Sequence, residues 1–161
     1  NTVGLRQLQG GNQLEPLLES LLRTRETLKT ETGRQVPLVV KLSPDMADED
    51  LSVTASVLTK LGIDGVIATN TTIQRFAIAH QRYATETGGL SGAPLRQLSL
   101  AAVRKLRALL GKSFPIIGVG GIASLKDAQE MRNAGADLIQ IYTGLVYEGP
   151  GLVRTLVRNL K

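Results

Sequence analysis

The fold is decided by the stretch Pro115-Ile116-Ile117-Gly118-Val119-Gly120-Gly121-Ile122, whose pattern returns in Leu138-Ile139-Gln140-Ile141-Tyr142-Thr143-Gly144. Each is an apolar run of strand length that ends in small or polar residues and precedes a helix-like segment, which is typical of a parallel strand buried on both faces. The glycines leave the backbone bare where the first strand ends, so several N–H groups can turn toward one anion. We therefore predict a phosphate-binding loop there.

Composition restricts the class of protein. The 161 residues are 42% hydrophobic and 20% charged, which is typical of a soluble globular domain, and we expect one domain over residues 1–161. No apolar run approaches the ~20 residues of a membrane span. The absence of Cys excludes disulfides and thiolate metal sites. Basic residues are scattered and aromatic residues are only 3%, so the net charge of +5 does not indicate nucleic-acid binding.

The hydrophobic periodicity predicts one helix followed by four strand–helix units. We expect strands at 37–43, 65–70, 115–122 and 138–144, and helices at 13–31, 48–61, 99–110, 124–134 and from Pro150 onward. Asp48 and Ser99 are the expected N-caps of two helices, and Ser124 with Asp127 resembles a capping box. The segment 71–98 has no periodicity, and a loop of this length in a compact domain usually covers or binds a ligand.

Polar or bare residues end all four expected strands: Lys41 and Ser43, Thr69 and Asn70, Gly120 and Gly121, Tyr142 and Thr143. In a (β/α) barrel the carboxyl ends of the strands share one mouth, where such folds carry out their chemistry. A complete eight-stranded barrel needs about 250 residues. We therefore expect an α/β fold in which this chain supplies the C-terminal four strand–helix units of a (β/α)₈ TIM barrel.

A doubly wound sheet is the alternative architecture, since a chain of this length could complete one. Residues Gly118 to Ala123 satisfy the loose G-x-G-x-x-[G/A] dinucleotide pattern. That fold also needs an acidic residue at the end of the next strand, where this chain has Tyr142-Thr143, and Asp137 lies at the wrong end. A barrel phosphate site explains the same glycines without the acid.

Three polar side chains allow two interpretations each. Lys41 is either an edge-strand lysine in solvent or a cation in the barrel mouth, where it would stabilise negative charge on a cofactor ring such as a reduced flavin. Asn70 either caps its own loop or offers a donor and an acceptor to a planar imide or carboxylate. His80 lies in the aperiodic segment without catalytic or metal-binding partners, so we expect it at the surface and no metal site.

Five motifs together closely resemble class 2, quinone-dependent dihydroorotate dehydrogenase, over the whole chain. They are Asn1-Thr2-Val3-Gly4-Leu5-Arg6-Gln7-Leu8-Gln9, Val40-Lys41-Leu42-Ser43-Pro44-Asp45, Gly62-Ile63-Asp64-Gly65-Val66-Ile67-Ala68-Thr69-Asn70-Thr71-Thr72, Thr87-Gly88-Gly89-Leu90-Ser91-Gly92 and Ile116-Ile117-Gly118-Val119-Gly120-Gly121. The first motif points to class 2 in particular. The family fold is an FMN-binding (β/α)₈ barrel, in agreement with the strand-end pattern.

The resemblance implies oxidation of dihydroorotate to orotate for pyrimidine biosynthesis, with FMN as cofactor and a membrane quinone as electron acceptor. Lys41 would contact the flavin ring and Thr69 would line the flavin site. The other cofactor-binding residues implied, including those around the phosphate, are Gly92, Gly120, Gly121, Tyr142 and Thr143. The residues implied to hold orotate are Asn1, Asn70 and Thr71.

The chain departs from the family pattern at its start. The family's catalytic base is a Ser just upstream of the position matched by Asn1, and the first half of the barrel with the helical segment that meets quinone and membrane would also lie upstream. We expect the chain to begin inside a longer product, membrane-associated at a bacterial cytoplasmic or mitochondrial inner membrane, and to be inactive alone. The alternatives are a non-catalytic phosphate- or flavin-binding half-barrel, which could self-associate, and another phosphate-binding barrel enzyme.

Overall fold

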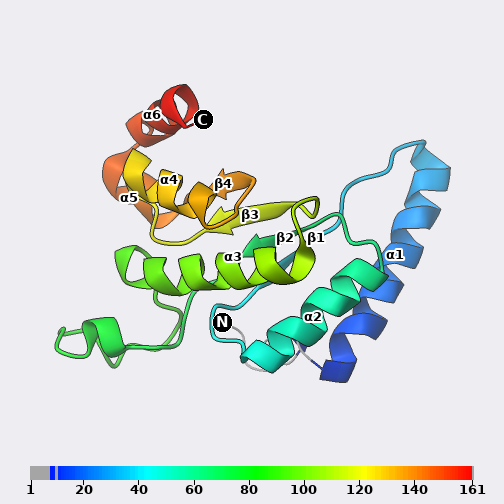
Figure 1. Ribbon diagram of the computed structural model, residues 1–161, viewed down its shortest axis with the longest axis horizontal. Coiled ribbons are helices and arrows are strands. Elements are labelled where there is room, and N and C mark those ends of the chain that lie inside the picture. Colours follow the sequence, from blue (N-terminus) through cyan, green and yellow to red (C-terminus); the bar gives the residue numbers. More distant parts are fainter. Residues whose placement is uncertain (1–7, 10, 161) are drawn as a thin grey trace.

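The structure, a computed structural model, describes residues 8–9 and 11–160 and contains one four-stranded parallel sheet in the order β1-β2-β3-β4 (Figure 1). The strands are β1 (Val39–Leu42), β2 (Gly65–Ala68), β3 (Ile116–Val119) and β4 (Leu138–Gln140). The helices are α1 (Gly11–Thr32), α2 (Asp48–Lys60), α3 (Arg96–Leu110), α4 (Leu125–Asn133), α5 (Thr143–Glu148) and α6 (Gly151–Asn159), with 3₁₀ turns η2 (Phe76–Ile78) and η3 (Ala93–Leu95). The predicted order of a helix followed by four strand–helix units is confirmed.

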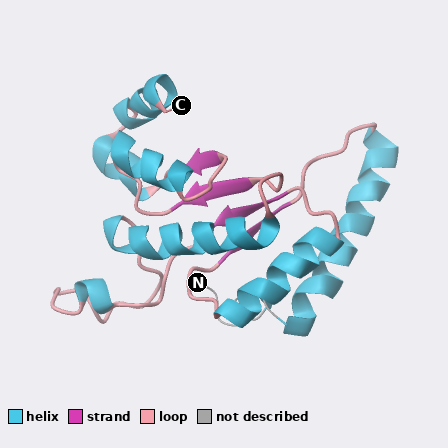
Figure 2. Ribbon diagram, in the orientation of Figure 1, coloured by secondary structure: helices cyan, strands magenta, loops and turns pink. Residues whose placement is uncertain are grey.

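Helices cover one face of this sheet. In the strand register, Leu42 lies beside Ala68, Ala68 beside Gly118, and Gly118 beside Ile139, so this row faces one way. The hydrophobic core joins that face to side chains of α2, α3, α4 and α6, among them Leu58, Leu106, Met131 and Leu152. A doubly wound sheet needs helices on both faces, so that alternative is wrong (Figure 2).

The opposite face of the sheet is open. Lys41, Ile67, Ile117 and Leu138 stand side by side in this row. Lys41 is exposed, and Leu138 at the β4 edge is 61% exposed. The expectation of strands buried on both faces therefore suits β3, where Val119 is buried, but is wrong for β4. In a closed barrel this open face would be the interior.

Arg107 fastens the sheet to α3 at the amino ends of β3 and β4. Its guanidinium donates hydrogen bonds to the carbonyl oxygens of Gly135 (2.7 and 2.9 Å) and Phe114 (2.9 Å), and to the Asp137 carboxylate (2.6 Å). Asp137 also accepts from the backbone N–H of Ile116 at 2.8 Å. One side chain thus sets the relative position of two strands and a helix.

Asp64 has the same function between α1 and β1. Its carboxylate accepts a hydrogen bond from the N–H of Leu38 at 2.7 Å and forms an ion pair with Arg25 of α1. The Leu38 hydrogen bond, assisted by Arg25 and opposed by partial burial, holds the pKa of Asp64 below its usual value. The carboxylate therefore stabilises this corner of the fold in its charged form.

Helix α3 and helix α2 begin differently from the sequence-based expectation. Asp48 is the first residue of α2 and Ala47 takes the N-cap position, without a side-chain cap. Helix α3 begins at Arg96, after the 3₁₀ turn that contains Pro94, so Ser99 lies inside the helix rather than at its N-cap. The expected cap at Ser124 is confirmed, because its Oγ accepts a hydrogen bond from Asp127 N at 3.2 Å.

The last predicted strand, 138–144, is shorter than expected, and its final residues belong to a helix. Strand β4 ends at Gln140, and α5 begins at Thr143, a residue that the sequence analysis placed in the strand. Pro150 occupies the N-cap position of α6 rather than its first turn. Among the helices of residues 8–9 and 11–160, none is long and apolar enough to cross a bilayer.

Candidate functional site

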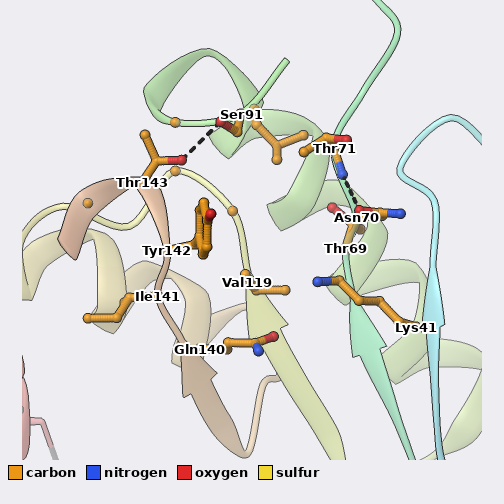
Figure 3. A pocket seen from close by; sticks show the side chains of 15 residues that line it. Lys41, Thr69, Asn70, Thr71, Ser91, Val119, Gln140, Ile141, Tyr142 and Thr143 are labelled. Carbon is orange, nitrogen blue, oxygen red and sulfur yellow. Dashed lines mark hydrogen bonds between the residues drawn. The ribbon is translucent and has the colours of Figure 1, made fainter. Parts of the chain in front are cut away.

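A pocket of about 230 Å³ lies where the carboxyl ends of all four strands meet the end of the long segment that follows β2 (Figure 3). All the site residues predicted from the sequence line it except Asn1, which lies outside the described residues. The lining comprises Lys41, Thr69, Asn70, Thr71, Ser91, Gly92, Leu95, Val119, Gly120, Gly121, Gln140, Ile141, Tyr142, Thr143 and Gly144. The structure therefore gathers the predicted residues into one site.

Lys41 enters the pocket from β1. Its side chain points from the open face of the sheet into the pocket, on the same side as Val119 and Gln140 (Figure 3). It makes no hydrogen bond or ion pair with the part of the chain that the structure describes. Since β1 is an edge strand, both interpretations of Lys41 are compatible with this position: the ammonium group is exposed, and it also faces the pocket.

The end of β2 contributes Thr69, Asn70 and Thr71. Thr69 is buried, its N–H donates to Val119 O at 2.9 Å, and its Oγ1 lies 3.0 Å from Ser99 Oγ. Asn70 Oδ1 accepts a hydrogen bond from Thr71 N at 3.0 Å, as the loop-cap interpretation predicts. The Asn70 NH₂ group has no partner within the described residues. Asn70 therefore offers a planar amide donor at the mouth.

The loop after β3 can contain only glycine at two positions. Gly120 and Gly121 have φ values of 126° and 69°, in the left-handed region. A Cβ at position 120 would lie 2.2 Å from Ser99 Oγ, and one at 121 would lie 2.7 Å from the Arg96 Cα. The bare backbone of both residues lines the pocket, as the predicted phosphate-binding loop requires.

Ser91 and Gly92 bring the long segment against the start of α5. Thr143 Oγ1 donates a hydrogen bond to Ser91 Oγ at 2.9 Å, and a Cβ on Gly92 would lie 3.2 Å from Thr143 Cγ2. Tyr142 stands at the rim with 78% of its surface exposed. A second cavity of about 480 Å³ adjoins this contact and reaches Tyr147. The rim between β4 and α5 thus has room for an extended ligand.

The aperiodic segment is held by specific hydrogen bonds. Thr72 and Leu90 exchange backbone hydrogen bonds of 2.7 and 3.1 Å, and the Asp45 carboxylate accepts from Thr72 Oγ1 and from Ile73 N. Arg75 donates to the carbonyl oxygen of Gly88 at 2.6 Å and to three other carbonyls. Figure 1 shows the segment, in green, projecting beyond α3. His80 is exposed there, as predicted.

An ion pair lies behind the glycine loop. The Arg96 guanidinium pairs with the Asp127 carboxylate, whose second oxygen accepts from Ala123 N at 3.1 Å and Ser124 Oγ at 2.8 Å. Burial alone would raise the pKa of Asp127, but the hydrogen bonds from Ser124 and Ala123, together with Arg96, lower it below its usual value. The carboxylate is therefore the charged centre of a small network.

Sequence reasoning missed several residues of this site. Gln140 ends β4 on the pocket side, where the strand-end pattern could have indicated it, and Ser91 lay within a stretch rich in turn formers. No local pattern points to Ser99 or Arg96, because their partners are 30 and 31 residues away. Within residues 8–9 and 11–160, no cluster of His, Asp and Glu could hold a metal ion.

The dihydroorotate dehydrogenase family model matches residues 1–161. The chain belongs to the dihydroorotate dehydrogenase family. Its relatives named dihydroorotate dehydrogenase (quinone) include those of Verminephrobacter eiseniae, 55% identical over 161 residues, and Bordetella avium, 52% identical over 161 residues. Both matches cover 100% of this chain but only 45% and 46% of the relatives. The chain therefore spans about half the length of these family members.

Solved structures of the family confirm the fold. The crystal structure of the Eimeria tenella enzyme in complex with ferulenol matches 99% of this chain and 46% of its own, with a TM-score of 0.92 and 35% identity. The ligand-free form matches with a TM-score of 0.90. The four-stranded sheet and its helices are therefore part of a family TIM barrel, as the strand-end pattern predicts.

Proposed function

We propose that the protein carrying this chain oxidises dihydroorotate to orotate in pyrimidine biosynthesis, with FMN as cofactor and a membrane quinone as electron acceptor. The observation that carries the proposal is the meeting of Lys41, Asn70 and Gly121 around one pocket of a family barrel. These residues come from three different strand ends. Another phosphate-binding barrel enzyme would explain Gly121 but would leave Lys41 and Asn70 without a role.

The residues present fit FMN. Lys41 would place a positive charge beside the flavin ring, and Thr69 would line the ring site. The backbone of Gly92, Gly120 and Gly121 offers a surface free of side chains, with Tyr142 and Thr143 beside it for the phosphate. When bound, FMN would supply the hydride acceptor and the route of the electrons to quinone.

The substrate would lie on the β2 side of the mouth. The Asn70 NH₂ group can donate to a carbonyl or carboxylate oxygen of the orotate ring, and Thr71 lies next to it. Asn1, the third predicted contact, lies outside the described residues. Since the family's base is a Ser expected upstream of Asn1, these side chains would orient the substrate rather than remove its proton.

The site requires further structure to close. A pocket of about 230 Å³ is smaller than the 300–1,000 Å³ typical of small-molecule sites. Apolar residues are exposed on both flanks of the open sheet, namely Leu17, Leu21 and Leu28 of α1 and Leu138, Val146 and Val157 near the β4 edge. We expect the N-terminal half of the barrel to cover both flanks, and this chain alone to produce no orotate.

A non-catalytic half-barrel that binds phosphate or flavin is the second candidate function. The observation that favours it is local: the glycine loop, Ser99, Arg96 and Asp127 all belong to this chain. An anion could therefore bind without the other half. In this case the exposed flanks would be covered by a second copy of the chain.

A titration of the chain with FMN, followed by quenching of flavin fluorescence, tests the cofactor site. We expect saturable binding that Lys41→Ala and Gly121→Val weaken, whereas Lys112→Ala, at an exposed lysine outside the pocket, leaves it unchanged. Absence of binding would mean that the cofactor site requires the closed barrel. Equal binding by all three variants would contradict the proposed site.

Adding the N-terminal portion of the Verminephrobacter eiseniae relative separates the two functions. Dye reduction with dihydroorotate that appears only in the mixture supports the dehydrogenase. A stable homodimer that binds phosphate ligands and ignores the added half supports the binding module. Orotate production by the purified chain alone would contradict the expected dependence on the other half.

A further inference from the structure

The first turns of helices α3 and α4 hold the glycine loop, residues Gly120 to Ala123, from the side away from the pocket. Arg96 opens α3, and its backbone lies directly beneath Gly121, where an added Cβ would meet the Arg96 N and Cα at 2.8 and 2.7 Å. Its guanidinium pairs with Asp127, in the first turn of α4. Arg96 therefore contacts the loop at Gly121, and it pairs with Asp127, which holds the other end of the loop at Ala123.

Asp127 holds the end of the loop through hydrogen bonds with Ala123 and Ser124. Its carboxylate accepts hydrogen bonds from Ala123 N and Ser124 Oγ, while its own N–H donates to Ser124 Oγ at 3.2 Å. The residue is 8% exposed. Neither Arg96 nor Asp127 lines either of the two cavities at the mouth. These two side chains would therefore act on a ligand without lining its cavity, through the position of the loop and through their charges.

The pair also controls charge. A carboxylate this close to an anion-binding loop would repel a phosphate if it stood alone, and Arg96 neutralises it. A loop held in its binding conformation before the ligand arrives saves the entropy of ordering it on binding. Both effects favour the phosphate and leave an uncharged part of the ligand untouched.

We propose that Arg96 and Asp127 are positioning residues that hold the loop from Gly120 to Ala123 for the cofactor phosphate, and so set the preference of the site for FMN over riboflavin. The proposal rests on the proposed FMN-dependent function. It adds to that function two residues, Arg96 and Asp127, that lie outside the pocket and support the loop.

The test compares dissociation constants for FMN and for riboflavin, which differ only by the phosphate, in the full-length protein. We expect Arg96→Gln to weaken FMN binding about tenfold, the scale on which supporting hydrogen bonds act on metal ligands, and to leave riboflavin binding within twofold. Asp127→Asn should weaken FMN binding less, because the positive charge that it leaves on Arg96 attracts the phosphate, whereas the carboxylate left by Arg96→Gln repels it. Adding Asp127→Asn to Arg96→Gln should restore part of the affinity.

The matched control is the second arginine–aspartate pair of α3, Arg107 with Asp137, at the opposite ends of the strands. Arg107→Gln should lower the melting temperature without changing the ratio of the two dissociation constants. If Arg96→Gln does not fold, Arg96→Lys and Asp127→Asn supply the same comparison. A ratio unchanged in every Arg96 and Asp127 variant that folds would overturn the proposal, whereas an unsubstituted protein that binds no FMN would overturn the proposed function itself.

Discussion

Thr69 and Ser99 place their hydroxyl oxygens 3.0 Å apart, and both side chains are buried. Thr69 directly follows β2 at the mouth, and Ser99 lies in the first turn of α3. The same Ser99 hydroxyl occupies the space that a Cβ on Gly120 would need. One serine therefore sets the separation between the strand end, the helix and the glycine loop.

Replacing Ser99 with Ala should destabilise the protein by about 1–2 kcal/mol, because it leaves the buried Thr69 hydroxyl without a partner. Urea unfolding measures the change. Ser52→Ala is the control, since that exposed hydroxyl of α2 bonds only to Asp48 O of its own helix, and its effect should stay within about 0.5 kcal/mol. Equal effects of the two substitutions would contradict the role of the Thr69 contact.

Gly121→Ala should cost more than the same change at Gly62, although both glycines have similar φ values of 69° and 62°. Strain from the left-handed backbone, about 1–2 kcal/mol, is common to both. Only position 121 adds a clash with Arg96, because nothing lies within 4 Å of a Cβ at position 62. Urea unfolding should show the larger loss for Gly121→Ala, and FMN titration should show lost binding for that variant alone.

The sequence allowed the fold and most of the site to be predicted because both follow from strand ends. Parallel strands end on one side of a sheet, so Lys41, Asn70, Gly121 and Thr143 had to meet once four strands were recognised. The register adds only detail to that conclusion. The meeting of these four residues in one pocket could therefore be predicted without any knowledge of side-chain contacts.

The missed features depend on contacts that local patterns do not encode. Helix α5 has six residues, too few for a periodic signal, and it begins at Thr143, shortly after β4 ends at Gln140. Serine is a common N-cap residue, which is why Ser99 was expected to begin the helix. The 3₁₀ turn with Pro94 makes α3 begin earlier, so Ser99 lies inside the helix and its hydroxyl bonds with Thr69. Tertiary contacts override such local preferences.

Arg107→Lys should destabilise the protein by about 2 kcal/mol, although it keeps the charge. A lysine can still approach Asp137, but its single ammonium group cannot reach the carbonyls of Gly135 and Phe114 together. Arg104→Lys, at an exposed position on the same helix, serves as control and should change the unfolding free energy by less than about 0.5 kcal/mol. An unfolding free energy that Arg107→Lys leaves unchanged would show that the ion pair with Asp137 alone holds the strands together.

Asp64 should stabilise the fold only while it is charged. Its folded-state pKa is lowered, chiefly by the Leu38 N–H and further by Arg25, while in the unfolded chain an Asp titrates near about 3.9. The stabilisation is therefore complete above that unfolded value and is lost as the pH falls through the lowered folded value. Since the side chain is 34% exposed, we expect Asp64→Asn to cost only about 1 kcal/mol at neutral pH.

Urea unfolding of the unsubstituted protein and of Asp64→Asn, at neutral pH and at about pH 2.5, measures this dependence. The difference between the two should be smaller at the acid end, because the stabilisation from the charged carboxylate declines as the pH falls below the unfolded-state pKa toward the lowered folded-state pKa. Asp50→Asn is the control, because it changes an exposed carboxylate on α2 that has no hydrogen bond or ion pair within the described residues, and its effect at neutral pH should stay within about 0.5 kcal/mol. A difference for Asp64→Asn that is as large in acid as at neutral pH would mean that shape, and not charge, stabilises the contact between α1 and β1.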